Sequence, residues 1–171
     1  MGKYYYIETA LPTISIGVKP EISFKEVRDM LSMNASKEDL ALVADLLQLI
    51  DLSNIHALWM GMPLDDRGNY TPKELEEELL VRDEIPEFLD DYLGRYDSRE
   101  ERLRYFSSLY ASFYKDRQEK LKSGFLKRYF AMEREIRLVL TALRAKRFGR
   151  DIIRELQFED STDPLVADIL A

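Results

Sequence analysis

The chain has 171 residues and a net charge of −7; 46% of its residues are hydrophobic and 33% are charged. This composition supplies a sizeable core and, because glycine and proline are scarce, favours a mainly α-helical chain. The acidic pI near 4.9 argues against a general nucleic-acid-binding domain, and the lack of cysteine excludes disulfides, thiolate zinc sites and cysteine nucleophiles.

The first predicted element is a short β-strand, or an anchored N-terminal segment, in "KYYYIETAL" (residues 3–11). This stretch is rich in aromatic residues, which favour strands, and Pro12 ends it. The N-terminal residues lack the apolar middle of a signal peptide, and no apolar run reaches the ~18–20 residues of a membrane span. We therefore expect a cytoplasmic protein without a membrane-spanning segment.

Helix-start signals follow at intervals along the first half. Ser23 and Glu26 form a capping box before a helix over residues 24–33. Ser36 caps a second helix, over residues 37–52, in which apolar residues recur at helical spacing. The sequence therefore predicts two successive helices after the N-terminal segment.

A loop and two shorter helices complete the first half. Residues 56–70 contain proline and glycine breakers and are expected to form a loop. Thr71 and Pro72 then provide an N-cap and a first-turn proline for a helix over residues 73–81. A further helix is expected over residues 87–96, directly after a proline.

Two long helices are predicted in the second half, over residues 99–121 and 124–148. Both carry apolar residues at alternating three- and four-residue steps, which predicts a core-facing seam on each helix. These residues are Leu103, Phe106, Tyr110 and Phe113 in the first helix, and Phe125, Tyr129, Met132, Ile136, Val139 and Leu143 in the second. The short connection predicts a long antiparallel helical hairpin.

Charge is segregated along the chain. Residues 65–91 contain 11 acids and 3 bases (−8), whereas residues 102–150 contain 14 bases and 4 acids (+10). We expect a single helical domain spanning the whole chain, with an acidic lobe over about 1–97, a basic hairpin over about 98–150, and a C-terminal segment over 151–171. Because the final residues "DPLVADILA" lack a helix stop, we expect the sequence to be truncated there.

No pattern in the sequence indicates catalysis, a metal site or a cofactor. The lone histidine, His56, lacks the companion ligands that histidine metal sites recruit. Glycine-rich phosphate loops and a nucleophile elbow are absent. A hydrolase would need carboxylates such as Glu76, Asp90 and Glu133 to converge in one pocket. The prediction is therefore a non-enzymatic protein with no catalytic, cofactor-binding or metal-binding residues.

The candidate site residues lie on the last long helix and just beyond it. Glu133 and Arg137 are four residues apart, in the favourable order for a helical ion pair. The pair would be structural, or else an acid/base or binding pair at an interface. The stretch "LTALRAKRFGRD" adds four cations within seven residues: Arg144, Lys146, Arg147 and Arg150. Cations in the last turn complement the helix dipole, and the same cluster would suit an interface.

The aromatic stretch "YFSSLYASFY" (residues 105–114) has two interpretations. Its helical spacing and its small residues favour a packed core. The flanking bases would instead suit a stacking platform for single-stranded nucleic acid, if the rings were exposed. The exposure of Phe106, Tyr110 and Phe113 distinguishes the two.

Two stretches of the sequence resemble a bacterial family of unknown function that is encoded alongside V-type ATP synthase subunits. They are "KYYYIETALPTIS" and "FLKRYFAMEREIRLVLTALRAKRFGRDIIREL". The helix ending in Leu-Arg-Ala-Lys is also similar to one in the C-type subunit of V-type ATPases, which is the d-type subunit in eukaryotes. The matching residues are Glu133, Arg137, Leu140, Leu143, Arg144, Lys146 and Arg147.

The resemblance implies a non-enzymatic accessory or central-stalk subunit of a bacterial V-type ATP synthase, which would couple the stalk to the membrane rotor ring. Its partners would be the other subunits of the stalk and ring, and its location the cytoplasm or, through the complex, the inner membrane surface. The alternative is a nucleic-acid-binding regulator that uses the basic hairpin.

Overall fold

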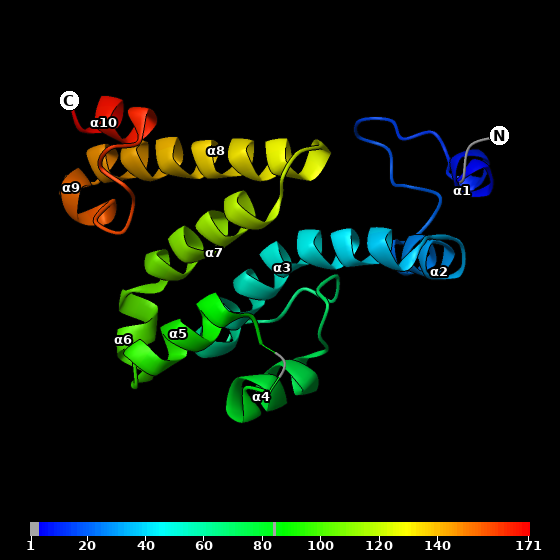
Figure 1. Cartoon of the computed structure of the whole chain (residues 1–171), viewed down its shortest axis with the longest axis horizontal. Helices are drawn as coiled ribbons and strands as arrows, with labels where there is room; N and C mark the ends of the chain where they lie inside the picture. The colour runs from blue at the N-terminus through cyan, green and yellow to red at the C-terminus, as the bar shows by residue number, and fades with distance from the viewer. Residues whose placement is uncertain (1–3, 84) are drawn as a thin grey trace. The chain divides into compact units, whose positions relative to one another are not determined.

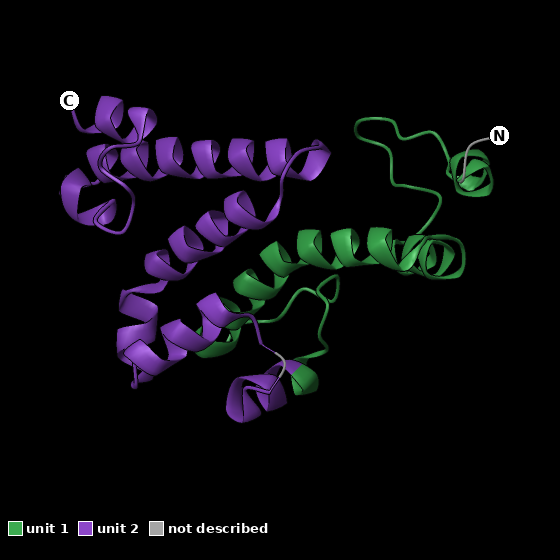
Figure 2. Ribbon diagram, in the orientation of Figure 1, with its two compact units in different colours: residues 1–74 green, residues 75–171 purple. Residues whose placement is uncertain are grey.

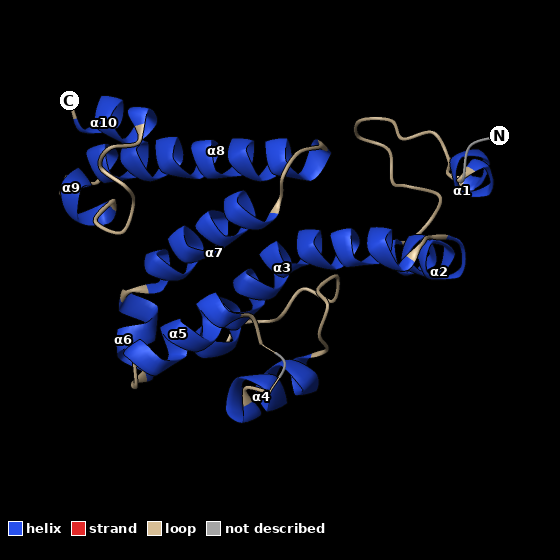
Figure 3. Ribbon diagram, viewed as in Figure 1, coloured by secondary structure: helices blue, strands red, loops and turns tan. Residues whose placement is uncertain are grey.

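The computed structural model describes residues 4–83 and 85–171, and these residues form helices and no strand (Figures 1 and 3). The predicted mainly α fold is confirmed. The chain divides into two compact units, residues 1–74 and 75–171 (Figure 2). This boundary differs from the change of charge near residue 97, and the organisation as one domain stays a prediction.

The predicted N-terminal strand is wrong, because helix α1 (Tyr5–Ala10) occupies that stretch; Lys3 lies outside the described residues. The helix satisfies its backbone groups locally, whereas a strand needs a neighbour with which to pair. Thr9 Oγ1 also donates a hydrogen bond of 2.9 Å to the Tyr5 carbonyl. Aromatic content alone therefore misled the strand prediction.

The helices α2 (Phe24–Asn34) and α3 (Lys37–Met60) confirm the next two predictions. The capping box of Ser23 and Glu26 is formed at the start of α2, and the Ser36 side chain caps α3. The loop expected from residue 56 begins later, however. The α3 helix continues to Gly61, whose left-handed backbone (φ 68°) ends it, and this conformation favours glycine.

The α3 helix holds the loop that follows it through two buried polar side chains, Asp51 and Asn54. Asp51 accepts a hydrogen bond of 2.8 Å from the Asn69 backbone, and Asn54 exchanges two bonds of 2.8 Å with the Asp65 backbone. Burial raises the pKa of Asp51. Gly68 passes so close that an added Cβ would lie 2.4 Å from Asp51 Oδ1. Asp51 and Asn54 therefore hold the loop against α3.

By length and composition alone, α3 is also apolar enough to cross a membrane. Asp51 and Asn54 give it one packed, hydrogen-bonded side, but only 28% of its apolar window is buried. The absence of a membrane-spanning segment and the cytoplasmic location stay predictions.

The α4 helix (Pro72–Val81) and α5 helix (Glu87–Arg95) match the sequence prediction, but the long helix expected over residues 99–121 is broken in two. It consists of α6 (Arg99–Arg104) and α7 (Phe106–Lys120). The break lies at Tyr105, whose ring stacks on Tyr96 at 4.9 Å between centroids. Its carbonyl accepts a hydrogen bond from the Ser108 side chain. These contacts hold the chain at an angle between two helical runs.

Aromatic rings form the centre of the second unit. Phe113 of α7 is fully buried, and its ring meets Phe88 of α5 at 5.7 Å and Phe130 of α8 (Phe125–Arg147) at 5.5 Å. Phe106 is buried as well, so the predicted core role is confirmed for Phe106 and Phe113. Leu103, which lies on α6, and Tyr110 are half-buried. The chain turns at residues 121–124, and α8 runs back to complete the helical hairpin (Figure 1).

The C-terminal residues fold onto the far end of α8. They form α9 (Ile152–Glu155) and α10 (Pro164–Leu170), and Asp163 caps α10. Leu138 of α8 packs with Leu156 and Val166 in a buried cluster. Segments on either side of α8 in the sequence, α7 before it and α9–α10 after it, therefore pack against this helix.

Candidate functional site

The α8 helix has one buried and one exposed apolar face. Phe130, Leu138 and Ala145 are buried against the rest of the second unit. We call the opposite stripe the α8 seam; it consists of Phe125, Tyr129, Met132, Ile136, Val139 and Leu143. Tyr129 is half-buried and the other five are exposed, from 40% for Val139 to 70% for Phe125. The prediction that this seam faces the core is therefore wrong.

Helical geometry explains the error. Successive residues turn by about 100° around the axis, so Phe130 and Leu138 point away from the seam. The seam carries more apolar residues than the buried face. The apolar spacing alone therefore predicted the seam as the core-facing side of the helix. The buried face uses fewer apolar residues because two arginines, Arg134 and Arg137, complete it with ion pairs.

An ionic cluster fastens the C-terminal segment to α8. Arg134 lies 2.9 Å from Glu159 and 2.9 Å from Asp163, and Arg137 lies 2.8 Å from the other oxygen of Glu159. The Glu159 side chain is only 5% exposed. Removing one partner from such a cluster leaves an uncompensated buried charge, which is strongly destabilising. The cluster therefore fixes the position of the segment on the helix.

The predicted pair of Glu133 with Arg137 is not the one that forms. Arg137 instead reaches Glu159, and its guanidinium lies over the ring of Tyr110 at 5.1 Å. Its Nε is buried without a hydrogen-bond partner. Glu133 lies half-buried near Tyr129, where burial first, and the charge of Glu133 second, raise the pKa of the phenol. Arg137 is structural, whereas Glu133 borders the α8 seam.

Two members of the cluster, Asp163 and Arg134, are held in their charged forms. Burial alone would raise the pKa of Asp163, but hydrogen bonds from the Val166 backbone and from Arg134 outweigh it and lower the pKa. The guanidinium of Arg134 loses solvent as well, yet the charges of Glu159 and Asp163 raise its pKa. The arrangement is an ion-pair network without a free base or nucleophile.

The four predicted cations Arg144, Lys146, Arg147 and Arg150 are all exposed. Arg150 lies 3.5 Å from Glu155, but it is 66% exposed, and such surface pairs contribute little. Among the described residues, no ion pair joins Arg144 or Lys146 to an acid. The structure thus brings Arg144, Lys146 and Arg147 together beside the end of the α8 seam and leaves their charges in solvent.

The sequence missed the residues that matter most to the ionic cluster. Arg134, Glu159 and Asp163 were not among the candidates, because they are far apart in the sequence and their charges look like ordinary surface residues. One local signal was available: Asp163 before Pro164 is a typical helix start, and its backbone contacts are indeed those of an N-cap. The partnership with Arg134 leaves no such local trace.

Comparison with known proteins confirms a family of unknown function, whereas its link to V-type ATP synthases stays a prediction. The family described as Protein of unknown function (DUF2764) matches residues 1–171. The chain belongs to this family. It is similar to uncharacterised proteins of Chlamydia muridarum (32% identity), Chlamydia trachomatis (30%) and Chlamydia pneumoniae (31%), each over 176 residues.

Each alignment covers 99% of this chain and 66% of the relative, so the chain spans about two thirds of the length of these family members. No solved structure matches it.

The other side chains weighed for a chemical site do not come together among the described residues. Within residues 4–83 and 85–171, no group of three or more histidine, aspartate or glutamate side chains is placed to hold a metal ion. Glu76 and Asp90 are exposed on α4 and α5, so they do not converge with Glu133 in a pocket. At the surface of α8, a long apolar stripe is bordered by charged side chains of both signs.

Proposed function

We propose that this protein is a non-enzymatic accessory or central-stalk subunit of a bacterial V-type ATP synthase, which binds its neighbours through α8. The observation that carries the proposal is the exposed α8 seam on a helix whose other face is fully anchored. Exposed apolar residues that line up along one helix mark an interaction surface, whereas singly scattered ones do not. The resemblance of "LTALRAKRFG" to the V-type-associated family supports the choice of this complex.

A coupling subunit must transmit force, and the contacts of α8 suit that task. The helix is held by the ring contact of Phe113 with Phe130, by the cluster around Leu138, and by the ion pairs of Arg134. A load applied to the α8 seam would pass through these contacts into the second unit. No moving part or active site is required of such a spacer.

The test is affinity purification of the full-length protein from its native cells, with mass spectrometry of what accompanies it. We expect stalk or ring subunits of the ATP synthase to be enriched over a tag-only control, and to remain after nuclease treatment. A purification that enriches none of these subunits contradicts the proposal.

The exposed cluster of Arg144, Lys146 and Arg147 keeps nucleic-acid binding as the second candidate. The α7 aromatics do not support it, because Phe106 and Phe113 are buried and Tyr110 is half-buried. Fluorescence anisotropy with single-stranded DNA over a salt series distinguishes the two. Tight binding that weakens steeply with salt favours the second candidate, whereas the ATP synthase proposal expects no such binding.

A further inference from the structure

The α8 seam has the spacing of a coiled coil. Its six residues follow one another at steps of four, three, four, three and four, from Phe125 to Leu143. This alternation is the heptad pattern, which keeps the apolar residues in line with a second helix wound around the first. No helix of the second unit covers the seam, because five of the six side chains are exposed.

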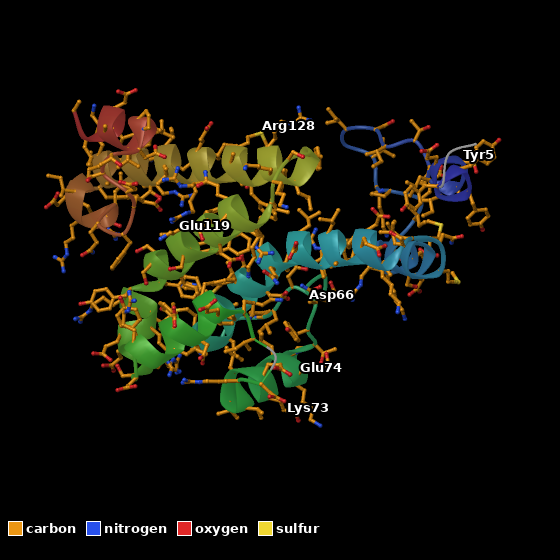
Figure 4. All side chains as sticks on the ribbon, in the orientation of Figure 1. Tyr5, Asp66, Lys73, Glu74, Glu119 and Arg128 are labelled. Carbon is orange, nitrogen blue, oxygen red and sulfur yellow. The ribbon has the colours of Figure 1, made fainter. Side chains whose placement is uncertain are left out.

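The residues that border the seam carry an ordered charge pattern. In heptad terms, Arg128 and Glu135 lie on one flank, and Glu133 and Arg147 lie on the other. Lys146 continues the line of the seam at its end. Both ends of the surface are therefore basic and its middle is acidic, and Figure 4 shows Arg128 reaching away from α7 near the first end.

This pattern disfavours a second copy of the chain as the partner. In an antiparallel pair, Arg128 would approach the basic end of the other copy, and Glu133 would face Glu133 of the second copy. In a parallel pair, Arg128 would gain Glu133 of the second copy, but Lys146 would face itself in line with the seam. Charges on the flanks and in the seam set partner choice in coiled coils. The flanking charges therefore oppose the antiparallel pair, and Lys146 in the seam opposes the parallel one.

We infer that the α8 seam forms a heterotypic coiled coil with an amphipathic helix of another protein, one with heptad-spaced apolar residues and acidic residues near both ends. Such a helix would cover the exposed apolar stripe and neutralise Arg128, Arg147 and Lys146. The inference rests on the proposed function, because it names the chemistry of the partner that this same surface would bind.

Two synthetic helices test the inference on the purified full chain. Both carry leucine at the seam positions and glutamine at the flanking positions of the middle; at the flanking positions near both ends, one has glutamate and the other has lysine. We expect the acidic peptide to bind at least about tenfold more tightly, a difference of ~1.4 kcal/mol, as measured by fluorescence anisotropy. Raising the salt concentration should reduce the difference in affinity between the two peptides, because salt screens the exposed flanking charges.

Variants locate the binding surface. Ile136→Glu and Leu143→Glu change exposed seam residues, so the fold should remain and the acidic peptide should bind at least about tenfold more weakly. The matched control is Ile153→Glu, since Ile153 is 68% exposed in the same unit but lies off the seam. Arg147→Glu leaves the seam intact and should reverse the preference between the two peptides in part. Circular dichroism checks the helix content of each variant.

Several results would overturn the inference. They are equal binding of the two peptides, no binding of either, equal losses in the control variant, or a dimer of the wild-type chain that Ile136→Glu dissociates.

A failure of the proposed function looks different. If the acidic peptide binds as expected but no ATP synthase component accompanies the native protein, the coiled coil stands and the complex is another one. If the ATP synthase subunits are recovered equally well with Ile136→Glu, the proposed membership of the complex is supported and the coiled coil at the α8 seam is refuted.

Discussion

The seams of α7 and α8 have the same three- and four-residue spacing but opposite surroundings. Phe106 and Phe113 of α7 are buried, at 7% and 0% exposure, whereas Ile136 and Leu143 of α8 are 46% and 58% exposed. Spacing therefore shows that a helix has a continuous apolar face, but it does not show what covers that face. An exposed face with core-like spacing is the feature that distinguishes a binding helix from a packing helix.

The difference follows from where the neighbours lie. The ring contacts of Phe113 place α7 against both α5 and α8, so its seam is enclosed. The helices α7, α9 and α10 pack against α8 on the side opposite the seam, around Phe130 and Leu138. Its seam faces away from all of these elements of the second unit.

The largest effect is expected from emptying the enclosed seam. Phe113→Ala should lower the free energy of unfolding by about 3–5 kcal/mol, because it leaves a cavity among three other rings. The matched change on the exposed seam, Ile136→Ala, should cost less than about 1 kcal/mol. Chemical denaturation of both variants measures the difference. Equal losses would mean that the two seams are buried alike and would contradict the contrast.

A second, smaller effect concerns the ionic cluster that anchors α8. Glu159→Gln should lower the free energy of unfolding by about 3 kcal/mol, since it leaves Arg137 without a carboxylate and weakens the hold on Arg134. Glu155→Gln is the control, because its pair with Arg150 is solvent-exposed and should change stability by no more than about 0.5 kcal/mol. If the two variants unfold alike in denaturant, the cluster does not anchor the segment.

The pH dependence of the free energy of unfolding tests the contribution of Asp163 to the same ionic cluster. The pKa of Asp163 is lowered in the folded chain, so its ionised form stabilises the fold above the ordinary value of 3.8. That contribution should be lost as the pH falls below 3.8 and through the lowered pKa. Asp163→Asn retains a helix cap but cannot ionise, so its stability should depend less on pH over this range. Parallel pH dependences for the two proteins would refute an ionic role for Asp163.

The smallest effect on stability is expected from the basic end of α8. Arg144 is exposed and has no ion pair among the described residues, so Arg144→Glu should change the free energy of unfolding by no more than about 0.5–1 kcal/mol, mainly through the helix dipole. The same variant should weaken co-purification of the partner if the cluster borders the interface. Thermal unfolding and co-purification measure the two effects. A large loss of stability with unchanged co-purification would make Arg144 a structural residue.

Local signals in the sequence predicted the helices well. The Ser23 and Glu26 capping box, the Ser36 cap, and the bounds of α8 all rest on short-range backbone hydrogen bonds, which neighbouring residues determine. The strand expected near Tyr5 failed because strand formation depends on a distant partner. The break at Tyr105 was missed for a similar reason, since its ring contact with Tyr96 lies across a turn.

The candidate site was predicted only in part. The cations Arg144, Lys146 and Arg147 are exposed near one another because they are close in the sequence, and their role in an interface stays a prediction. The partner of Arg137 is 22 residues away, at Glu159, and the i−4 neighbour Glu133 was the only partner that spacing could suggest. The exposure of Ile136 depends on which side of α8 the later helices cover, and no local pattern encodes that choice.

The role of the α8 seam is tested most directly by photo-cross-linking in native cells. Leu143 is replaced by photoreactive benzoylphenylalanine, with position 153 as the off-seam control, and the adducts are identified by mass spectrometry. We predict an adduct only from position 143, joined to a heptad-spaced helix with acidic flanks in one of the ATP synthase subunits. An adduct to the same chain, to a second copy, or to no protein at all would contradict the assignment of this seam as the partner-binding surface.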